Sequence, residues 1–189
     1  MRKFGLMVLA CTALGAVPQA AAAAIPQAEM PGFWSTPTIA GYGKIHIPAN
    51  GIHRPDPREH YKIVLALTQA AKDPATVNGS LDHVARTVNL YVASGVPLSH
   101  LKVAAVAYGG ATPIVLDNAH YRAAFGEDNP NLALLAALKR AGVEVSVCAQ
   151  AMGEHGYDFD GIDRNARLSV SGLTTVTVLQ HQGYALMPE

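Results

Sequence analysis

The stretch that decides the fold runs from Val143 to Met152 and reads Val-Glu-Val-Ser-Val-Cys-Ala-Gln-Ala-Met. Its three valines are β-branched residues at every second position, so the first half of the stretch predicts a β-strand. Gly142 precedes the strand and ends a helical pattern. Cys148 then falls at or just past the carboxyl end of the strand, where open α/β sheets place their chemistry.

Strand-like and helix-like segments alternate on both sides of this stretch. Apolar runs predict strands at residues 61–67, 101–108, 166–170 and 184–187. Helical patterns cover residues 81–92, 117–125, 130–141 and 173–182, and each is followed by a glycine. Five strands alternating with four or five helices predict a single α/β domain with a doubly wound, mainly parallel five-stranded sheet and right-handed crossovers.

Capping residues mark where three of these helices begin. Asn78 or Ser80 is expected to cap the first helix, and Ser171 the last. Asn129 is expected to cap the helix that precedes the Cys148 strand, with Pro130 at the first helical position, where its missing N–H costs nothing.

The segment that follows Cys148 is harder to assign. Residues 149–163 contain three glycines and four acidic residues, so they are either irregular or form one short helix. The segment is long enough to form a lid.

The beginning of the chain predicts export. Arg2 and Lys3 precede an apolar run, and small residues then offer cleavage sites, so residues 1–24 are predicted to be a signal peptide. This predicts a periplasmic protein. The run into Cys11 also loosely resembles a lipoprotein box, which leaves lipidation at Cys11 as an alternative to soluble export.

Residues 25–60 are rich in proline and glycine and show no helical period, which predicts an extended N-terminal arm before a domain at residues 61–189. A short strand or hairpin arm is expected within residues 42–47. Trp34 lies in the arm, and an arm that carries a tryptophan is expected to dock on the sheet or on a neighbouring chain.

Composition excludes several classes of partner. The chain has 14 basic and 14 acidic side chains, so it offers no basic surface for nucleic acid or acidic lipid. Downstream of the leader, no apolar run reaches the roughly 20 residues of a membrane span. After removal of the leader, the chain has the length of a single domain.

Cys148 would be the only cysteine left after export, because the other, Cys11, lies in the leader. In an oxidising compartment, a lone thiol is buried, paired between chains or reactive. The alternative to a functional thiol is a small buried hydrophobe, since free cysteines often have that role.

Glycines and histidines supply the other candidates for a site. Gly109-Gly110 follows the second strand and either cradles an anion or forms a plain tight turn; the spacing matches neither a dinucleotide fingerprint nor a P-loop. In both cases the turn lies at the same edge as Cys148. His120 and His155 could reach that edge, as could His181. No pair of residues has the spacing of metal ligands, so neither a metal nor a cofactor is expected.

Several segments resemble the exported branch of the DsrE/DsrF-like sulfur-relay family. They are Tyr121-Arg122, Phe125-Gly126, Asp128-Asn129-Pro130-Asn131, Leu138, Ala141-Gly142-Val143, Val147-Cys148-Ala149-Gln150 and Gln182-Gly183-Tyr184. The resemblance covers residues 61–188 and implies a flavodoxin-like sheet and homo-oligomers, commonly trimers or hexamers. For cytoplasmic members, it implies a cysteine that carries sulfur as a persulfide. Exported members generally have Cys-Gly-Gln at residues 148–150, where this chain has alanine in the middle, and many have His-Gly at residues 108–109, where this chain has Tyr-Gly.

Three hypotheses of function follow, and the sequence leaves open whether the protein turns over a substrate. In the first, Cys148 accepts sulfur from a donor protein and passes it to an acceptor. Gln150 and the Gly109-Gly110 turn would then line its pocket, with His155 or His120 as proton partner. The second is a non-catalytic oligomeric module that binds a small ligand. The third is an oligomeric scaffold in which the arm packs on neighbours.

Overall fold

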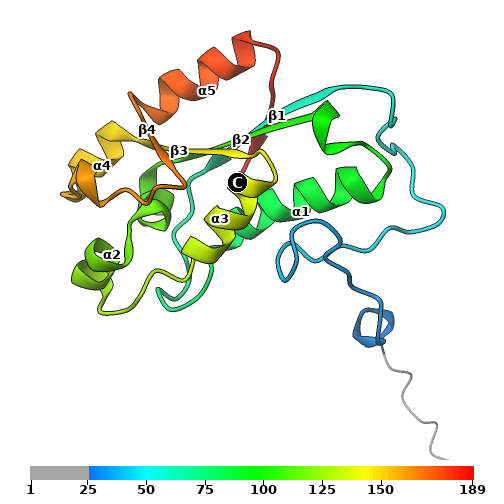
Figure 1. Ribbon diagram of the computed structural model, residues 1–189, viewed down its shortest axis with the longest axis horizontal. Coiled ribbons are helices and arrows are strands. Elements are labelled where there is room, and N and C mark those ends of the chain that lie inside the picture. Colours follow the sequence, from blue (N-terminus) through cyan, green and yellow to red (C-terminus); the bar gives the residue numbers. More distant parts are fainter. Residues whose placement is uncertain (1–25) are drawn as a thin grey trace, which may run out of the picture.

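The computed structural model describes residues 26–189, so the predicted signal peptide and Cys11 lie outside the described residues. Five parallel strands form one sheet in the order β4-β3-β2-β1-β5 (Figure 1). Their bounds are Tyr61–Leu67 (β1), Leu101–Ala107 (β2), Glu144–Cys148 (β3), Arg167–Ser169 (β4) and Ala185–Pro188 (β5). The prediction of a five-stranded parallel α/β sheet is confirmed.

Helices connect every pair of successive strands. The α-helices are Gly79–Ala93 (α1), Asn118–Phe125 (α2), Leu132–Arg140 (α3), Ala149–His155 (α4) and Gly172–His181 (α5). Short 3₁₀ helices cover Gln27–Glu29 (η1), Leu98–His100 (η2), Gly109–Val115 (η3) and Phe159–Gly161 (η4). The segment after Cys148 is therefore ordered into α4 and η4.

The direction of each crossover decides which face its helix covers. From β1 to β4, the chain steps along the sheet in one direction, and from β4 it returns past β1 to place β5 on the far edge. Because parallel crossovers are right-handed, reversing the direction moves the connecting helix to the opposite face. α1 and α3 thus cover one face and α5 covers the other, as Figure 1 shows with α5 alone above the sheet.

The two faces enclose cores of different size. Side chains alternate along β1, so Ile63, Leu65 and Leu67 face the larger core under α1 and α3. Val64 and Ala66 face a smaller core, which they share with Val106 and other residues under α5. Both faces of the central strands are buried, which explains why these strands are continuous apolar runs in the sequence.

The helix boundaries follow two of the predicted caps. Asn78 is the N-cap of α1, and its side-chain oxygen accepts hydrogen bonds from the N–H groups of Ser80 and Leu81 at 2.9 and 3.2 Å. Ser171 caps α5 through the N–H of Leu173. Gly142, with φ +82°, forms the left-handed turn between α3 and β3.

The prediction that Asn129 caps the next helix is wrong. α3 begins at Leu132, and Asn129 is buried before it. The side-chain oxygen of Asn129 accepts from the backbone and side-chain amides of Asn131, both at 2.9 Å, and its own amide donates to two carbonyls in and just after η3. Asn131 in turn accepts from the Asn78 N–H at 2.8 Å. These asparagines satisfy buried backbone groups where three segments meet. The Leu135 N–H donates to the Asn131 carbonyl at 2.9 Å, so α3 has Asn131 as its N-cap and begins beyond Asn129.

The arm, residues 26–60, is held to the domain mainly by two side chains of α1, those of Asn89 and Asp82; the Asp82 carboxylate accepts from the Gly43 N–H at 2.7 Å. The side chain of Asn89 is fully buried, and its oxygen accepts from the N–H groups of Thr38 and Ile39 at 3.0 and 2.8 Å. Its amide donates to the carbonyls of Tyr42 and Gly43, both at 2.9 Å. Four backbone groups of the arm are therefore satisfied by a single side chain, and the side chain of Ile39 completes the larger core.

Two other features of the arm differ from the expectation. The short strand expected within residues 42–47 is reduced to one isolated bridge between Ser35 and Ile45. Trp34 is 48% exposed and lies edge-on against Phe33, so it does not dock on the sheet of its own chain; docking on a neighbouring chain stays a prediction. Its indole N–H donates to the Ala28 carbonyl within the arm. The arm docks through polar side chains of α1 and buried isoleucines of its own, which composition alone does not single out.

Candidate functional site

Cys148 lies at the junction of two elements. It is the last residue of β3 and the N-cap of α4, and its Sγ accepts a hydrogen bond from the Ala151 N–H at 3.4 Å. Val145 and Val147 point into the larger core, so the alternation of the strand turns Cys148 toward the α5 face. The residue is 5% exposed.

The surroundings of the sulfur favour its charged form. Burial raises the pKa of the Cys148 thiol, but the hydrogen-bond donors around it outweigh burial and hold the pKa below its ordinary value. These donors are the backbone N–H groups of Gly172, Ala151 and Gln150 and the hydroxyl of Ser171. Two helices, α4 and α5, thus begin at the sulfur, and the positive ends of both favour a thiolate.

The pairing of β3 with β4 explains why α5 begins there. Cys148 pairs with Ser169 in the sheet, and the Ser169 hydroxyl donates to the Val147 carbonyl at 2.9 Å. Only Val170 and Ser171 separate β4 from α5, so the first turn of α5 must lie over the end of β3.

Glycine is required at the start of α5. A Cβ on Gly172 would lie 2.7 Å from the ring of Tyr108, which follows β2. Such an approach is too close for any side chain, so a larger residue would push α5 away from the sulfur. Sequence reasoning identified Ser171 only as a cap and did not identify Gly172. The one available signal was their position directly after the strand that pairs with β3.

Gln150 belongs to the same group of residues. Its backbone N–H is one of the donors that lower the pKa of the Cys148 thiol, and its side-chain amide donates to the Val170 carbonyl at 3.1 Å. The side chain thereby ties α4 to the short segment that leads into α5. The structure places Gln150 beside Cys148, where its amide links the two helices that meet at the sulfur.

The two glycines after β2 lie with a different group. Gly109 has φ +55° and begins η3, and a Cβ on Gly110 would lie 2.8 Å from the backbone nitrogen of Ala70. Close packing of two loops therefore explains the second glycine. Gly110 lines a hollow of about 260 Å³ between η3, α2 and the loop after β1, whose aromatic walls are Tyr121, Phe125, His155 and Tyr157.

None of the three candidate histidines, His120, His155 and His181, is among the groups that shift the pKa of Cys148, and His181 ends α5, at the opposite end of that helix from the thiol. His155 ends the seven-residue α4, about 10 Å along the helix from its start, and its Nε2 lies 3.0 Å from the Gly109 carbonyl. His120 lies on α2, where its Nδ1 is 2.9 Å from Asp117. That contact raises the pKa of His120, and Asp160 and Asp158 raise it further. Both histidines line a second hollow of about 260 Å³, with Asp158.

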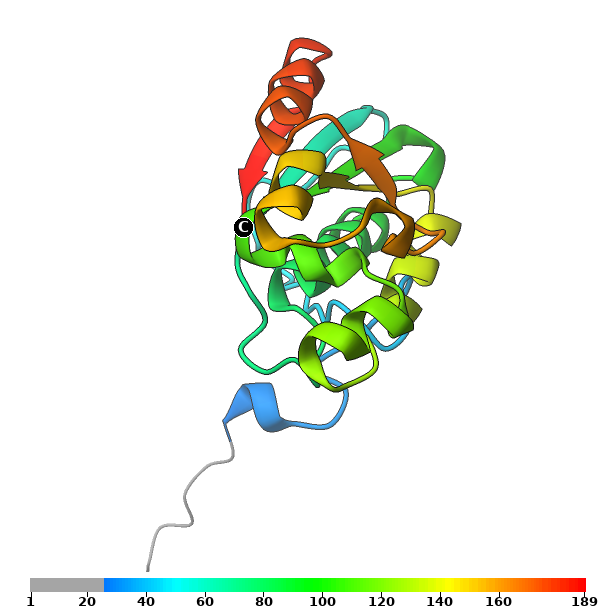
Figure 2. The same cartoon turned by 90° about the vertical axis from the view of Figure 1, so that its left-hand side faces the viewer.

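The carboxyl edge of the sheet is thus divided into two regions, and Figure 2 looks onto this edge. Cys148 and Gln150 belong to the first, under the start of α5. Gly110, His155 and His120 belong to the second, which lies over η3 and α2. The structure does not gather all the candidates in one pocket.

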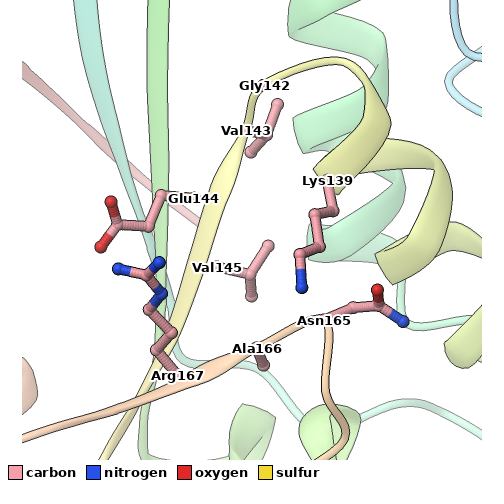
Figure 3. A pocket seen from close by; sticks show the side chains of 8 residues that line it. All are labelled: Lys139, Gly142, Val143, Glu144, Val145, Asn165, Ala166 and Arg167. Atoms are coloured by element: carbon pink, nitrogen blue, oxygen red, sulfur yellow. The ribbon is translucent and has the colours of Figure 1, made fainter.

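A further hollow, of about 180 Å³, lies beside the amino end of β3 (Figure 3). Its charged groups are Lys139, Glu144 and Arg167. The Lys139 ammonium already donates to the Arg164 carbonyl at 2.6 Å, and Figure 3 shows the ends of the Glu144 and Arg167 side chains beside one another on one side of β3. The eight residues that line this hollow include no thiol and no imidazole, so we place the chemistry at the other edge.

Comparisons with known proteins agree with this architecture. The chain is similar to a solved structure of a protein of unknown function, MTH1491 from Methanobacterium thermoautotrophicum, with a TM-score of 0.51 and 17% identity over 68% of this chain and 99% of that one. At this identity, the likeness supports the fold alone. A search of curated proteins gave no significant match.

Among residues 26–189, no helix combines the length and the apolar character needed to cross a membrane. A protein-family model matches residues 51–188, and that match begins within the arm and ends in β5. Since the match covers most of the chain, this protein belongs to the DsrE/DsrF-like family.

Proposed function

We propose that this protein is an exported sulfur carrier in which the Cys148 thiolate accepts a sulfane sulfur and passes it to a second thiol. The observation that carries the proposal is the position of Sγ, which is surrounded by backbone N–H groups at the start of two helices. A thiol with a lowered pKa is a thiolate at lower pH and attacks sulfur more readily. Membership of a sulfur-relay family supports the same chemistry.

The transfer needs no external oxidant or reductant. The Cys148 thiolate attacks the outer sulfur of a donor persulfide, R–S–SH, and a new S–S bond forms. The old S–S bond breaks, and its electron pair leaves with the donor as R–S⁻. The product, Cys148–S–SH, returns the outer sulfur in the same way to an acceptor thiolate, which regenerates the Cys148 thiolate. The N–H groups around Sγ would stabilise its negative charge before and after each step.

Burial of the sulfur limits how a donor can reach it. Ser171 and Gly172 lie against Sγ, and the Gln150 amide holds the preceding Val170. A donor protein would therefore have to displace the Val170–Gly172 segment. Val170, at the start of this segment, and Leu173, just after it, are 76% and 74% exposed, so apolar side chains lie on the surface beside the thiol. We propose that a donor or acceptor protein binds at this surface.

Mass spectrometry of protein purified from its own compartment tests the carrier directly. We expect an intact mass about 32 Da above the thiol form, which is one sulfur atom, lost on reduction and absent in Cys148→Ser. Sulfinic acid has nearly the same mass but resists reduction, so reducibility separates the two forms. Only the unmodified mass, after incubation with a low-molecular-weight persulfide, would contradict the proposal.

Export and oligomerisation are also part of the proposal. The leader at residues 1–24 supports a periplasmic location, and the resemblance to exported family members supports a homo-oligomer, a trimer or a hexamer. We expect the mature chain to begin near Ile25 in a periplasmic fraction. N-terminal sequencing that finds Met1 on protein from the cytoplasmic fraction would contradict the location, and an acyl chain on Cys11 would indicate lipidation.

The hollow between η3 and α2 favours a second function, small-ligand binding. Its aromatic walls and a volume of about 260 Å³ suit a small flat apolar ligand and are close to the lower end of the range for ligand pockets, roughly 300 Å³. Saturation-transfer NMR with indole as the probe tests this function. We expect Phe125→Ala to weaken the signal and Phe33→Ala, in the arm, to leave it unchanged. No indole signal would remove this candidate.

A further inference from the structure

Three side chains at the carboxyl edge have the chemistry of metal ligands. His120 lies on α2, and Asp158 and Asp160 lie in the segment after α4; one ligand atom from each lies within 4.8 Å of the others. The Nε2 of His120 is 3.7 Å from an Asp160 oxygen. A metal ion bound by one imidazole nitrogen and two carboxylate oxygens would lie roughly 2.0–2.2 Å from each of these atoms.

A fourth residue prepares the imidazole for this role. Asp117 is the N-cap of α2, and one of its oxygens accepts from the His120 backbone N–H and also contacts His120 Nδ1, both at 2.9 Å. With a carboxylate at Nδ1, the neutral ring carries its proton there and leaves the lone pair of Nε2 free. Metal-binding histidines are oriented in this way by a carboxylate on the other ring nitrogen.

Backbone hydrogen bonds hold the start of α2 beside the segment that follows α4. The Asp117 N–H donates to the Gly161 carbonyl at 2.8 Å, and the Asp163 N–H donates to the Val115 carbonyl at 2.8 Å. A Cβ on Gly161 would lie 2.5 Å from the His120 ring, so glycine alone allows the ring to lie flat against this turn. The imidazole is thus fixed before any ion arrives, which lowers the cost of binding.

The side away from these contacts is open. The hollow of about 260 Å³ that His120 and Asp158 share with Tyr157 leaves room beside the ligand atoms for water or a small molecule. One imidazole and two carboxylates with open positions suit a first-row divalent cation. We propose that His120, Asp158 and Asp160 bind Zn²⁺, oriented by Asp117. This site is separate from Cys148, and it does not depend on the sulfur-carrier function.

Zinc titration by calorimetry tests the proposal, with every protein carrying Cys148→Ser because a thiolate would itself bind zinc. At about pH 8, where an imidazole is unprotonated, we expect one zinc ion per chain. His120→Gln should weaken binding by about tenfold or more. His100→Gln is the matched control, since it removes an imidazole elsewhere on the surface, and it should leave binding unchanged.

Two more variants separate the metal site from folding. Asp117→Ser keeps a good helix cap but removes the carboxylate from Nδ1, so we expect about tenfold weaker binding with an unchanged helical signal by circular dichroism. Asp160→Asn changes an exposed side chain and should also weaken binding without altering the thermal midpoint. If His120→Gln and Asp160→Asn bound zinc as tightly as the Cys148→Ser parent, or if that parent bound no zinc, the proposal would be overturned.

Discussion

The two faces of the sheet are built for different tasks. The face under α1 and α3 is covered by two helices and by the arm, and its core includes fully buried leucines from β1, α1 and α3. The face under α5 has one helix, a small core of five buried residues, and apolar side chains that remain in solvent. Cys148 lies at the carboxyl edge of this thinner face.

This difference suggests that one face of the sheet provides most of the stability and the other provides access to the thiol. Most of the apolar area buried in the domain lies on the α1 and α3 face, so the free energy of unfolding should depend mainly on that face. The face under α5 has fewer buried contacts, so its cover can be displaced locally with less cost. Access to the buried Cys148 thiol requires such a displacement. The following predictions test this division.

The largest effect is expected from deleting a leucine side chain on each face. Leu138 on α3 is fully buried in the larger core, and Leu138→Ala should lower the free energy of unfolding by about 2–5 kcal/mol. Leu179 on α5 is only partly buried, so Leu179→Ala should cost about 1 kcal/mol. Urea denaturation of both variants measures the difference. Equal losses would show that the two faces contribute equally.

The next effect concerns the buried asparagines near the start of α1 and α3. Asn129→Ala leaves two carbonyls and the amides of Asn131 without their partner, so the free energy of unfolding should fall by about 1–3 kcal/mol. Asn50→Ala, at an exposed position in the arm, is the control and should change stability by less than about 0.5 kcal/mol. An Asn129 variant as stable as the control would mean that water replaces these bonds at no cost.

A smaller, pH-dependent effect is expected from Cys148. The pKa of its thiol is lower in the folded protein than in the unfolded chain, so between the two pKa values the unfolded chain binds more protons. Stability relative to Cys148→Ala should therefore rise with pH through this window. The contribution is complete above the unfolded value of about 8.5 and is lost as pH falls through the folded value. Urea denaturation of both proteins from about pH 6 to pH 9 measures it.

Two further measurements distinguish a thiolate from a core thiol at this position. If Cys148 serves only as a core hydrophobe, Cys148→Ser should cost about 1–3 kcal/mol and the stability difference from Cys148→Ala should not vary with pH. If it is a thiolate, Cys148→Ser should be nearly neutral at a pH below the folded pKa, and it should become less stable than the parent protein as pH rises, as Cys148→Ala does. Alkylation by iodoacetamide in the native protein should then show an apparent pKa below about 8.5.

Much of the fold follows from local patterns. The valines of β3 and the apolar runs of β1 and β2 predict buried strands, and Asn78 and Ser171 predict helix starts, because these signals act within a few residues. Asn129 was misassigned because what determines its role is not local. Its partners include carbonyls in and after η3, 13 and 15 residues earlier in the chain, and no cap pattern encodes them.

The site was predictable in its position but not in its composition. Cys148 at the end of a strand could be inferred, as could its nearness to Gln150. The donors from Ser171 and Gly172 could not, because they depend on the pairing of β4 with β3 and on the contact of Gly172 with Tyr108. The histidines could be placed at the right edge, but the division of that edge into two regions depends on the three-dimensional arrangement of η3, α2 and α4.

The smallest effect on stability is expected from the two most exposed apolar residues on the face under α5. They also test whether a neighbouring copy covers this face. Val170 and Leu173 are 76% and 74% exposed, so Val170→Ser/Leu173→Ser should change the free energy of unfolding of the monomer by less than about 0.5 kcal/mol. If the face is covered by a neighbouring copy, the same double variant should dissociate the oligomer, because exposed apolar surface is what an interface buries.

Sedimentation velocity at micromolar concentration distinguishes these outcomes. Ile52→Ser removes an apolar side chain that is 81% exposed in the arm, and it should leave the sedimentation coefficient unchanged. An oligomer that survives the double variant but not Ile52→Ser would place the interface on the arm. The apolar surface around Cys148 would then remain free for a sulfur donor in every copy, whereas an interface at Val170 and Leu173 would bring the thiols of neighbouring copies close to the contact between them.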